Sequence, residues 1–187
     1  LALAVVLPQA GNLGGGGFAV WAPDEGTALT IDFREVAPES TDPLAYFSDA
    51  DTVVAKRSLR GPMAVGVPGS PAGLWELYER CGSGRLSFFA LAEEAIRLAE
   101  EGWAVDPWLA RRLRSKALRD RMNPAARAVF YPGGEGLVEG ELLVQAELAG
   151  TLRSFARRGP KAIYEGVVAE QLVRELRRSP VPEDEAG

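Results

Sequence analysis

The residues with the clearest chemical potential lie in one stretch, where a glycine run is followed by a segment that ends in charged residues. Four glycines occupy residues 14–17, and Asp32-Phe33-Arg34-Glu35 closes the stretch. Residues without a Cβ allow another backbone or a ligand to approach closely. A guanidinium at Arg34 can bind a carboxylate through two parallel hydrogen bonds, and Asp32 can hold it in orientation. The stretch therefore predicts a substrate-anchoring site with a buried cation; the alternative is an Arg34–Asp32 pair that only finishes a sheet edge.

The glycine run partly matches two phosphate-binding patterns, and neither is favoured. The spacing Gly14-x-Gly16-x-x-Ala19 fits a loose dinucleotide loop, which needs a helix N-terminus after the glycines to hold the pyrophosphate. Residues 18–21 instead read Phe-Ala-Val-Trp, which is typical of a strand. A P-loop is excluded because no Lys-Ser or Lys-Thr pair follows the glycines. We expect no cofactor here.

The residues around the turn 23–26, Pro-Asp-Glu-Gly, predict a β-hairpin formed by residues 18–21 and 27–33. Side chains alternate between the two faces of a strand. We therefore expect three apolar side chains to be largely buried on one face, with two charged ones on the other: Leu29, Ile31 and Phe33, opposite Asp32 and Arg34.

Composition excludes several kinds of active site. The 187 residues contain no histidine, so Ser-His-Asp triads, Cys-His dyads and the commonest zinc sites cannot be assembled from this chain. An N-terminal Ser, Thr or Cys with its own amine as base would suffice, but the sequence begins with Leu1. The single cysteine, Cys81, allows no intrachain disulfide and is more simply a core residue than a reactive thiol. We expect no catalytic residue and no metal ligand in this chain.

The charge pattern argues against a nucleic-acid surface. The chain has 21 basic and 26 acidic residues, a net charge of −5. A basic helix is expected after Asp106-Pro107, but it lacks the interleaved aromatic residues that stack bases, which favours a solvated surface.

The apolar segment 1–7 ends at Pro8 and is too short to span a bilayer, so we expect it to be buried. It also lacks the pattern of a signal peptide.

Periodicity and capping residues predict several helices beside the hairpin. Ser70 is expected to cap a helix over residues 70–81, and Ser87 one that ends at Gly102. A third helix is expected from Asp106-Pro107, with Leu109, Leu113 and Ala117 pointing inward. Two more are expected over residues 145–158 and 167–178. A helical turn is expected at 43–47 and a short strand at 128–131. The prediction is an α+β fold in one domain, residues 1–187, with a poorly ordered tail at 179–187.

Several motifs, in this order along the chain, resemble the large subunit of γ-glutamyltranspeptidases. They cover most of the chain: Pro8; Gly-Gly-Gly-Gly-Phe at 14–18; Asp-Phe-Arg-Glu-Val-Ala-Pro at 32–38; Gly-Val-Pro-Gly-Ser at 66–70 through Ala-Gly-Leu at 72–74; Ala-Ile-Arg-Leu-Ala-Glu-Glu-Gly at 95–102; Gly-Pro at 159–160, Ala-Ile-Tyr-Glu-Gly at 162–166 and Ala-Glu at 169–170. One departure is Ala10-Gly11-Asn12-Leu13, where the family often has Ser-Gly-Ile.

The resemblance implies an N-terminal nucleophile hydrolase fold, a four-layer αββα sandwich completed by a small subunit that is absent from this chain. In that family both subunits come from one precursor by autocleavage, which exposes a threonine nucleophile at the start of the small subunit. More sequence precedes the first residue of this chain in the family. The resemblance places Arg34 at the position that binds the α-carboxylate of the γ-glutamyl group.

The function that this resemblance implies is cleavage of γ-glutamyl amides such as glutathione, with transfer of the γ-glutamyl group to water or an amino acid through an acyl-threonine intermediate. One alternative is a related acylase, of the cephalosporin or poly-γ-glutamate type, on the same fold. Another is an inactive homologue that acts as a binding module. The resemblance suggests a periplasmic or secreted protein, and a cytoplasmic one stays open.

Overall fold

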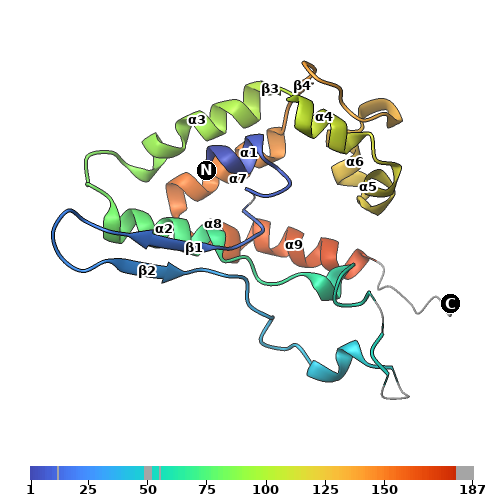
Figure 1. Ribbon diagram of the computed structural model, residues 1–187, viewed down its shortest axis with the longest axis horizontal. Coiled ribbons are helices and arrows are strands. Elements are labelled where there is room, and N and C mark those ends of the chain that lie inside the picture. Colours follow the sequence, from blue (N-terminus) through green and yellow to red (C-terminus); the bar gives the residue numbers. More distant parts are fainter. Residues whose placement is uncertain (12, 49–51, 55, 180–187) are drawn as a thin grey trace. The chain divides into compact units, whose positions relative to one another are not determined.

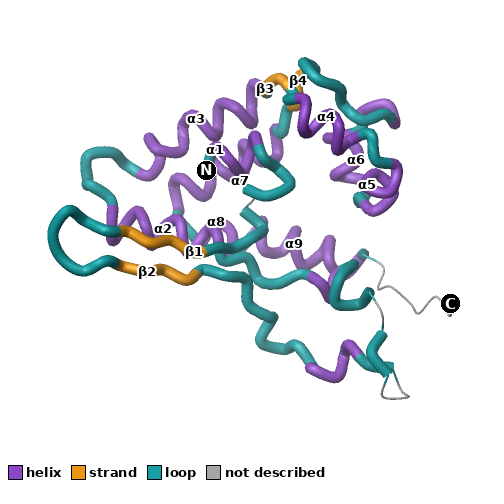
Figure 2. The backbone as a smooth tube through the Cα atoms, viewed as in Figure 1, coloured by secondary structure: helices purple, strands orange, loops and turns teal. Residues whose placement is uncertain are grey.

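The computed structural model describes residues 1–11, 13–48, 52–54 and 56–179, and the chain divides into two compact units (Figure 1). One unit comprises Leu1–Asn12 and Gly84–Arg158, and the other Leu13–Ser83 and Gly159–Gly187. Both units combine helices with short strands (Figure 2), which confirms the α+β class. Among the described residues, no helix has both the length and the apolar content to cross a membrane. Apart from Ser179, the predicted tail at 179–187 lies outside the described residues.

The first unit is built on two long helices and a short N-terminal one, α3, α7 and α1. Their bounds are Phe88–Glu101, Ala146–Arg158 and Ala2–Val6. Helix α3 packs along α7 and against α1, and the rings of Phe88 and Phe155 meet edge to face at 5.1 Å. The Ser87 hydroxyl accepts a hydrogen bond from the Ala90 N–H at 3.1 Å, so the predicted cap of this helix is confirmed.

The apolar N-terminal segment was expected to be buried, and only part of it is. Ala4 and Val5 are buried, whereas Leu3 on the other side of the short helix is exposed. Gln145, a buried polar residue, donates from Nε2 to the Val5 carbonyl at 3.0 Å, and its backbone N–H donates to the Ala99 carbonyl at 2.8 Å. These bonds connect the start of α7 to both other helices, so the buried amide is satisfied.

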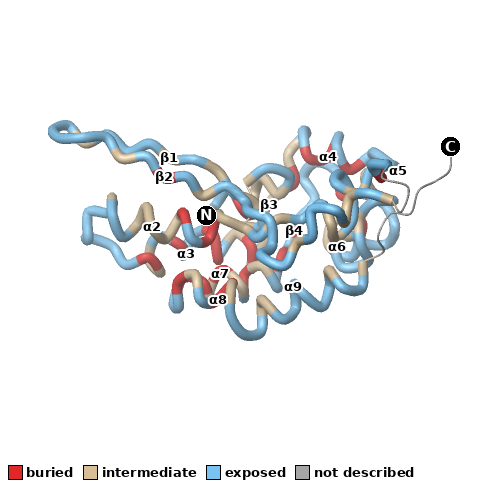
Figure 3. Tube along the Cα trace, turned by 90° about the horizontal axis from the view of Figure 1, so that it is seen from below, coloured by how far each residue is buried: buried red, intermediate tan, exposed pale blue. Residues whose placement is uncertain are grey.

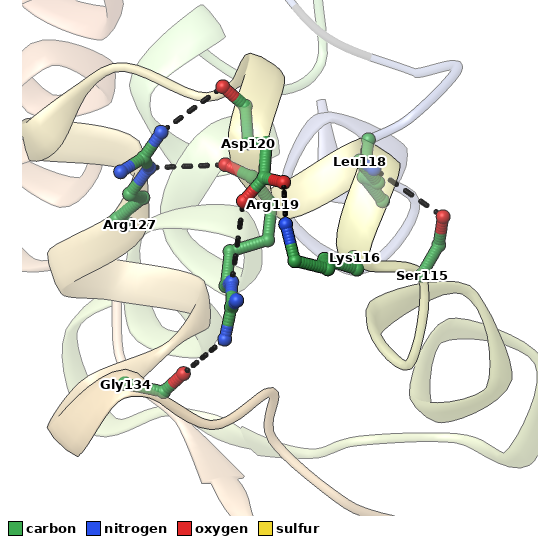
Figure 4. Close-up of polar contacts among 7 residues, drawn as sticks. All are labelled: Ser115, Lys116, Leu118, Arg119, Asp120, Arg127 and Gly134. Atoms are coloured by element: carbon green, nitrogen blue, oxygen red, sulfur yellow. Dashed lines mark hydrogen bonds and ion pairs between the residues drawn. The ribbon is translucent and has the colours of Figure 1, made fainter.

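A second group of elements in this unit surrounds a smaller apolar cluster. The elements are α4 (Pro107–Leu113), α5 (Lys116–Arg121), α6 (Pro124–Phe130), the turn η3 (Pro132–Gly134) and the paired strands β3 (Trp103–Ala104) and β4 (Leu142–Leu143). The single helix predicted after Asp106 is wrong, because Ser115 interrupts it and caps a new one, accepting from the Leu118 N–H at 3.3 Å (Figure 4). Leu118 therefore packs against the cluster, and Ala117, which was expected to point inward, is exposed.

The strand predicted at 128–131 is also wrong, because these residues belong largely to α6. Pro124 is the first helical residue, and the side chain of Asn123 accepts a hydrogen bond from the Ala126 N–H at 2.8 Å. A proline at this position and an asparagine cap are a strong helix start. They outweigh the β propensity of the Val-Phe-Tyr sequence that follows.

Two arginines, Arg119 from the predicted basic surface and Arg127 from α6, hold α5, α6 and η3 together (Figure 4). Arg127 donates to the backbone carbonyls of Arg119 and Asp120, both at 3.0 Å, near the C-terminus of α5. Arg119 donates to the Gly134 carbonyl at 3.1 Å, and Lys116 pairs with Asp120. Part of the positive charge in this region therefore satisfies carbonyl groups of the protein itself.

The described residues of the second unit form the predicted hairpin and three α-helices. Strands β1 (Phe18–Trp21) and β2 (Leu29–Asp32) are antiparallel, with Phe18 opposite Asp32, and the helices are α2 (Ser70–Cys81), α8 (Lys161–Tyr164) and α9 (Val167–Arg178). Short turns are η1 (Pro43–Tyr46), as predicted, and η2 (Pro62–Ala64). Ser70 proves to be the first residue of α2 rather than its cap, because Gly69 occupies that position. Helix α9 is exposed or half-buried along its whole length (Figure 3).

Candidate functional site

The backbone of Arg34 is fixed two residues after the end of β2. The hydrogen-bond ladder of the hairpin continues one pair further, with Gly17 donating to the Phe33 carbonyl at 3.2 Å and Phe33 donating back at 2.9 Å. The Asp32 carboxylate accepts a hydrogen bond from the Arg34 N–H at 2.9 Å. Arg34 therefore leaves a backbone that is anchored on its N-terminal side.

Two glycines enclose the backbone that carries Arg34. A Cβ at Gly16 would lie 2.5 Å from the Phe33 carbonyl oxygen, and a Cβ at Gly69 would overlap the same carbonyl from the start of α2. The Gly15 carbonyl also accepts the backbone N–H groups of Gly69 and Ser70, at 3.0 and 2.9 Å. The glycine run therefore permits a close approach between backbones. Two N–H groups at the N-terminus of α2 donate to the Gly15 carbonyl.

The alternation of faces predicted along β2 is confirmed, but the burial is only partial. Ile31 is buried, whereas Leu29 and Phe33 are half-buried. Asp32 and Arg34 are exposed. Within its own unit the two-stranded sheet packs against α2, so only the part of the apolar face nearest that helix loses its contact with solvent.

The expectation of a buried cation is wrong for this chain, because 63% of the Arg34 side chain is exposed. Its Nε lies 3.5 Å from the Glu35 carboxylate, and its guanidinium lies 5.7 Å from the centre of the Phe18 ring. The Asp32 carboxylate is bonded to the backbone, so it orients the strand end rather than the guanidinium. The Arg34 side chain therefore pairs loosely with Glu35 and not with Asp32, so the ion pair of the sheet-edge alternative is not formed.

Arg34 borders an open recess of about 480 Å³. The recess is lined by Asp32 and Phe33 from the strand end, by Gly69 and Glu76 from the start and middle of α2, and by Tyr164 from α8. A cation beside a partly apolar recess can bind a small molecule through a carboxylate while the rest of the molecule lies against carbon atoms.

Sequence reasoning missed the contribution of Tyr164. Its hydroxyl donates to the Pro68 carbonyl at 2.6 Å and accepts a hydrogen bond from the Ala72 N–H at 3.3 Å. Burial raises the pKa of this phenol, while the bond from Ala72 lowers it. Tyr164 belongs to the Ala-Ile-Tyr-Glu-Gly motif, so a signal was present, but nothing in the sequence places it beside residues almost a hundred positions earlier.

Groups suited to metal binding do not gather in the described ranges: no three His, Cys, Asp or Glu side chains lie close enough there to hold an ion. Cys81 is half-buried at the end of α2, and its thiol is not part of a disulfide.

Comparison with known proteins assigns this arrangement to a family. A sequence profile described as Gamma-glutamyltranspeptidase matches residues 1–180. The chain belongs to the γ-glutamyltranspeptidase family. The glutathione hydrolase proenzyme of Escherichia coli K12 is 38% identical over 181 residues, which are 95% of this chain and 30% of that protein. Glutathione hydrolase 3 of Arabidopsis thaliana is 36% identical over 96% of this chain and 27% of its own length.

The fold agrees with this membership. The γ-glutamyltranspeptidase of Helicobacter pylori superposes with a TM-score of 0.88 at 37% identity, over 95% of this chain and 51% of the solved chain. The family resemblance seen in the sequence and its fold are therefore confirmed. This γ-glutamyltranspeptidase homologue spans about 30% of the length of the curated relatives it matches.

Proposed function

We propose that this chain is the large-subunit portion of an enzyme that cleaves γ-glutamyl amides such as glutathione and transfers the γ-glutamyl group to water or to an amino acid. Family membership supports this reaction class, since the two relatives compared above are named glutathione hydrolases. The structural observation that carries the proposal is Arg34: its backbone is anchored at a strand end, and its mostly exposed side chain borders a recess.

In this proposal Arg34 binds the α-carboxylate of the γ-glutamyl donor. Its planar guanidinium can donate two parallel hydrogen bonds to the two carboxylate oxygens, which fixes both the position and the rotation of the donor. The contact with Glu35 is long and solvent-exposed, so a substrate carboxylate displaces it at little cost. Burial of the guanidinium, which this chain does not supply, is assigned to the small subunit.

The reacting groups are assigned to that small subunit, following the family pattern. The hydroxyl oxygen of its N-terminal threonine attacks the γ-carbonyl carbon, and the free amine of the same residue takes the hydroxyl proton. The C–N bond breaks, the leaving amine is protonated, and the γ-glutamyl group stays as an ester on threonine. Water or an amino acid then attacks the ester and releases the enzyme. Arg34 takes part by holding the donor in line for attack.

The experiment that tests the proposal uses the complete gene product, assayed with three donors: glutathione, a glutaryl cephalosporin and poly-γ-glutamate. We expect release of glutamate from glutathione, and γ-glutamyl transfer when an amino acid acceptor is added. Hydrolysis of the cephalosporin or the polymer without glutathione turnover would assign the acylase alternative. Binding of glutathione without turnover of any donor would assign the binding module.

A further inference from the structure

Tyr164 connects two segments of the second unit that are far apart in the sequence. It ends the short helix α8, and its half-buried hydroxyl bonds to both sides of the turn that begins α2: it donates to the Pro68 carbonyl and accepts from the Ala72 N–H. The bond to Pro68, at 2.6 Å, is at the short end of the range for O–H···O contacts. The hydroxyl therefore fixes residues 68–72 as a unit.

That turn is in direct contact with the residue before Arg34. Gly69 packs against the carbonyl of Phe33, and Gly73, in the first turn of α2, packs against its ring. A Cβ at either glycine would overlap atoms of Phe33. The contacts thus run without a gap from the Tyr164 hydroxyl through the turn to Phe33, and from Phe33 through one peptide bond to Arg34.

The Arg34 side chain has few contacts of its own. Its guanidinium is mostly exposed, with a loose ion pair to Glu35 and an aromatic contact to Phe18. Its position is therefore set chiefly by its backbone. A bidentate contact with a carboxylate needs both donors in place, and displacements of about 1 Å are enough to weaken such a site.

We propose that Tyr164 is a positioning residue for Arg34, and that its hydroxyl tunes the affinity of the enzyme for the α-carboxylate of the donor. This inference rests on the proposed function of Arg34 and adds a residue that does not touch the donor carboxylate itself. Loss of the hydroxyl frees the turn at residues 68–72, and the packing of Gly69 and Gly73 against Phe33 loosens. The guanidinium then samples positions that reach one carboxylate oxygen at a time.

The test is steady-state kinetics of the complete enzyme carrying Tyr164→Phe, which removes the hydroxyl and keeps the ring. Two matched donors are compared, a γ-glutamyl anilide and the glutaryl anilide that lacks the α-amino and α-carboxylate groups. Tyr164→Phe removes both hydrogen bonds of the hydroxyl, and only part of the resulting loss in the turn reaches the guanidinium. We expect KM for the γ-glutamyl donor to rise about three- to tenfold, with kcat within about twofold. The kcat/KM for the glutaryl donor should fall by less than that for the γ-glutamyl donor; any loss it does show reflects the place of Tyr164 in the lining of the recess.

The control is Tyr46→Phe, which removes another tyrosine hydroxyl bonded to a backbone carbonyl in the same unit, that of Met63, at 2.9 Å. Because that bond holds η1 and η2 rather than the turn beside Phe33, we expect both donors to keep their kinetic constants. A donor-selective rise in KM on Tyr46→Phe would show that any lost hydroxyl loosens Arg34, and the specific role of Tyr164 would be wrong.

The double variant Arg34→Met with Tyr164→Phe separates the two proposals. If Tyr164 acts through Arg34, the tyrosine change has no further effect once the guanidinium is gone. A further loss of kcat/KM in the Arg34→Met background, or equal losses on both donors from Tyr164→Phe alone, would overturn the positioning role of Tyr164. Neither result would contradict the proposed role of Arg34. If Arg34→Met itself fails to distinguish the donors, the proposed function is what fails.

A second variant covers the case in which Tyr164→Phe does not mature. Phe33→Leu keeps the hydroxyl and shortens the side chain that packs on Gly73, at the next step of the same contact chain. We expect the same donor-selective rise in KM. Unchanged KM for the γ-glutamyl donor with this variant would contradict the coupling between α2 and Arg34.

Discussion

Replacing Gly69 with alanine is the sharpest structural test of the strand end that carries Arg34. The new Cβ would overlap the Phe33 carbonyl, and neither group can rotate away, because the carbonyl is part of the backbone and the position of a Cβ is fixed by its own backbone. The Phe33 oxygen is also bonded to the Gly17 N–H at 3.2 Å. Relief therefore requires α2 and the strand end to separate.

The magnitude follows from the contacts that this separation disturbs. Overpacking of this kind costs about 1–3 kcal/mol. Moving Gly69 also strains the two bonds that the Gly15 carbonyl accepts from Gly69 and Ser70, each worth about 0.5–1.5 kcal/mol. Alanine recovers about 0.4–1 kcal/mol by reducing the entropy of the unfolded chain. We expect a net loss of about 2–4 kcal/mol in the free energy of unfolding.

Gly150→Ala is the matched control. Gly150 lies within α7, and a Cβ there would meet open space. The same substitution should therefore stabilise the protein, by about 0.5–1 kcal/mol. Urea denaturation of the complete protein, followed by circular dichroism, compares the two variants with the wild type. If Gly69→Ala proves neutral or as stabilising as Gly150→Ala, the close packing of α2 against the Arg34 backbone is wrong.

Two further predictions concern pH and a buried hydroxyl. The hydrogen bond from Arg97 lowers the pKa of the Glu94 carboxyl below its ordinary value of 4.5. The stabilisation from this bond is therefore present above pH 4.5 and is lost as pH falls through the lowered pKa. Glu94→Gln should accordingly flatten the fall in the free energy of unfolding below about pH 4.5. Tyr131 has a buried hydroxyl with no partner among the described residues, so Tyr131→Phe should leave Tm unchanged or raise it, whereas Tyr46→Phe, which breaks a hydrogen bond, costs about 1 kcal/mol and lowers Tm.

Local signals predicted most of the fold. The serine before α3 and the glycine after it set the limits of that helix within a residue, and the Pro-Asp-Glu-Gly turn identified the hairpin. The errors arose where two local signals competed. At Ser115 a capping residue interrupted a continuous apolar period, and at Asn123 a cap and a proline overrode strand-forming residues.

The candidate site was predictable only in part, because its geometry depends on contacts between distant residues. Alternation along β2 placed Asp32 and Arg34 on one face correctly. It could not show that Asp32 would bond to the backbone, or that the guanidinium would be exposed in this chain. The bond from Tyr164 to Pro68 spans 96 positions, and no periodicity or motif spacing reports such a contact.

The central claim, that Arg34 binds the α-carboxylate of a γ-glutamyl donor, is tested most directly by the kinetics of Arg34→Met in the complete enzyme. Losing one member of a desolvated ion pair costs about 2–5 kcal/mol, a loss of tens- to thousands-fold in kcat/KM. We expect KM for the γ-glutamyl anilide to rise first, the glutaryl anilide to be unaffected, and Arg111→Met, which removes an exposed arginine of α4, to change neither. Equal losses on both donors would mean that Arg34 serves the structure and not the substrate.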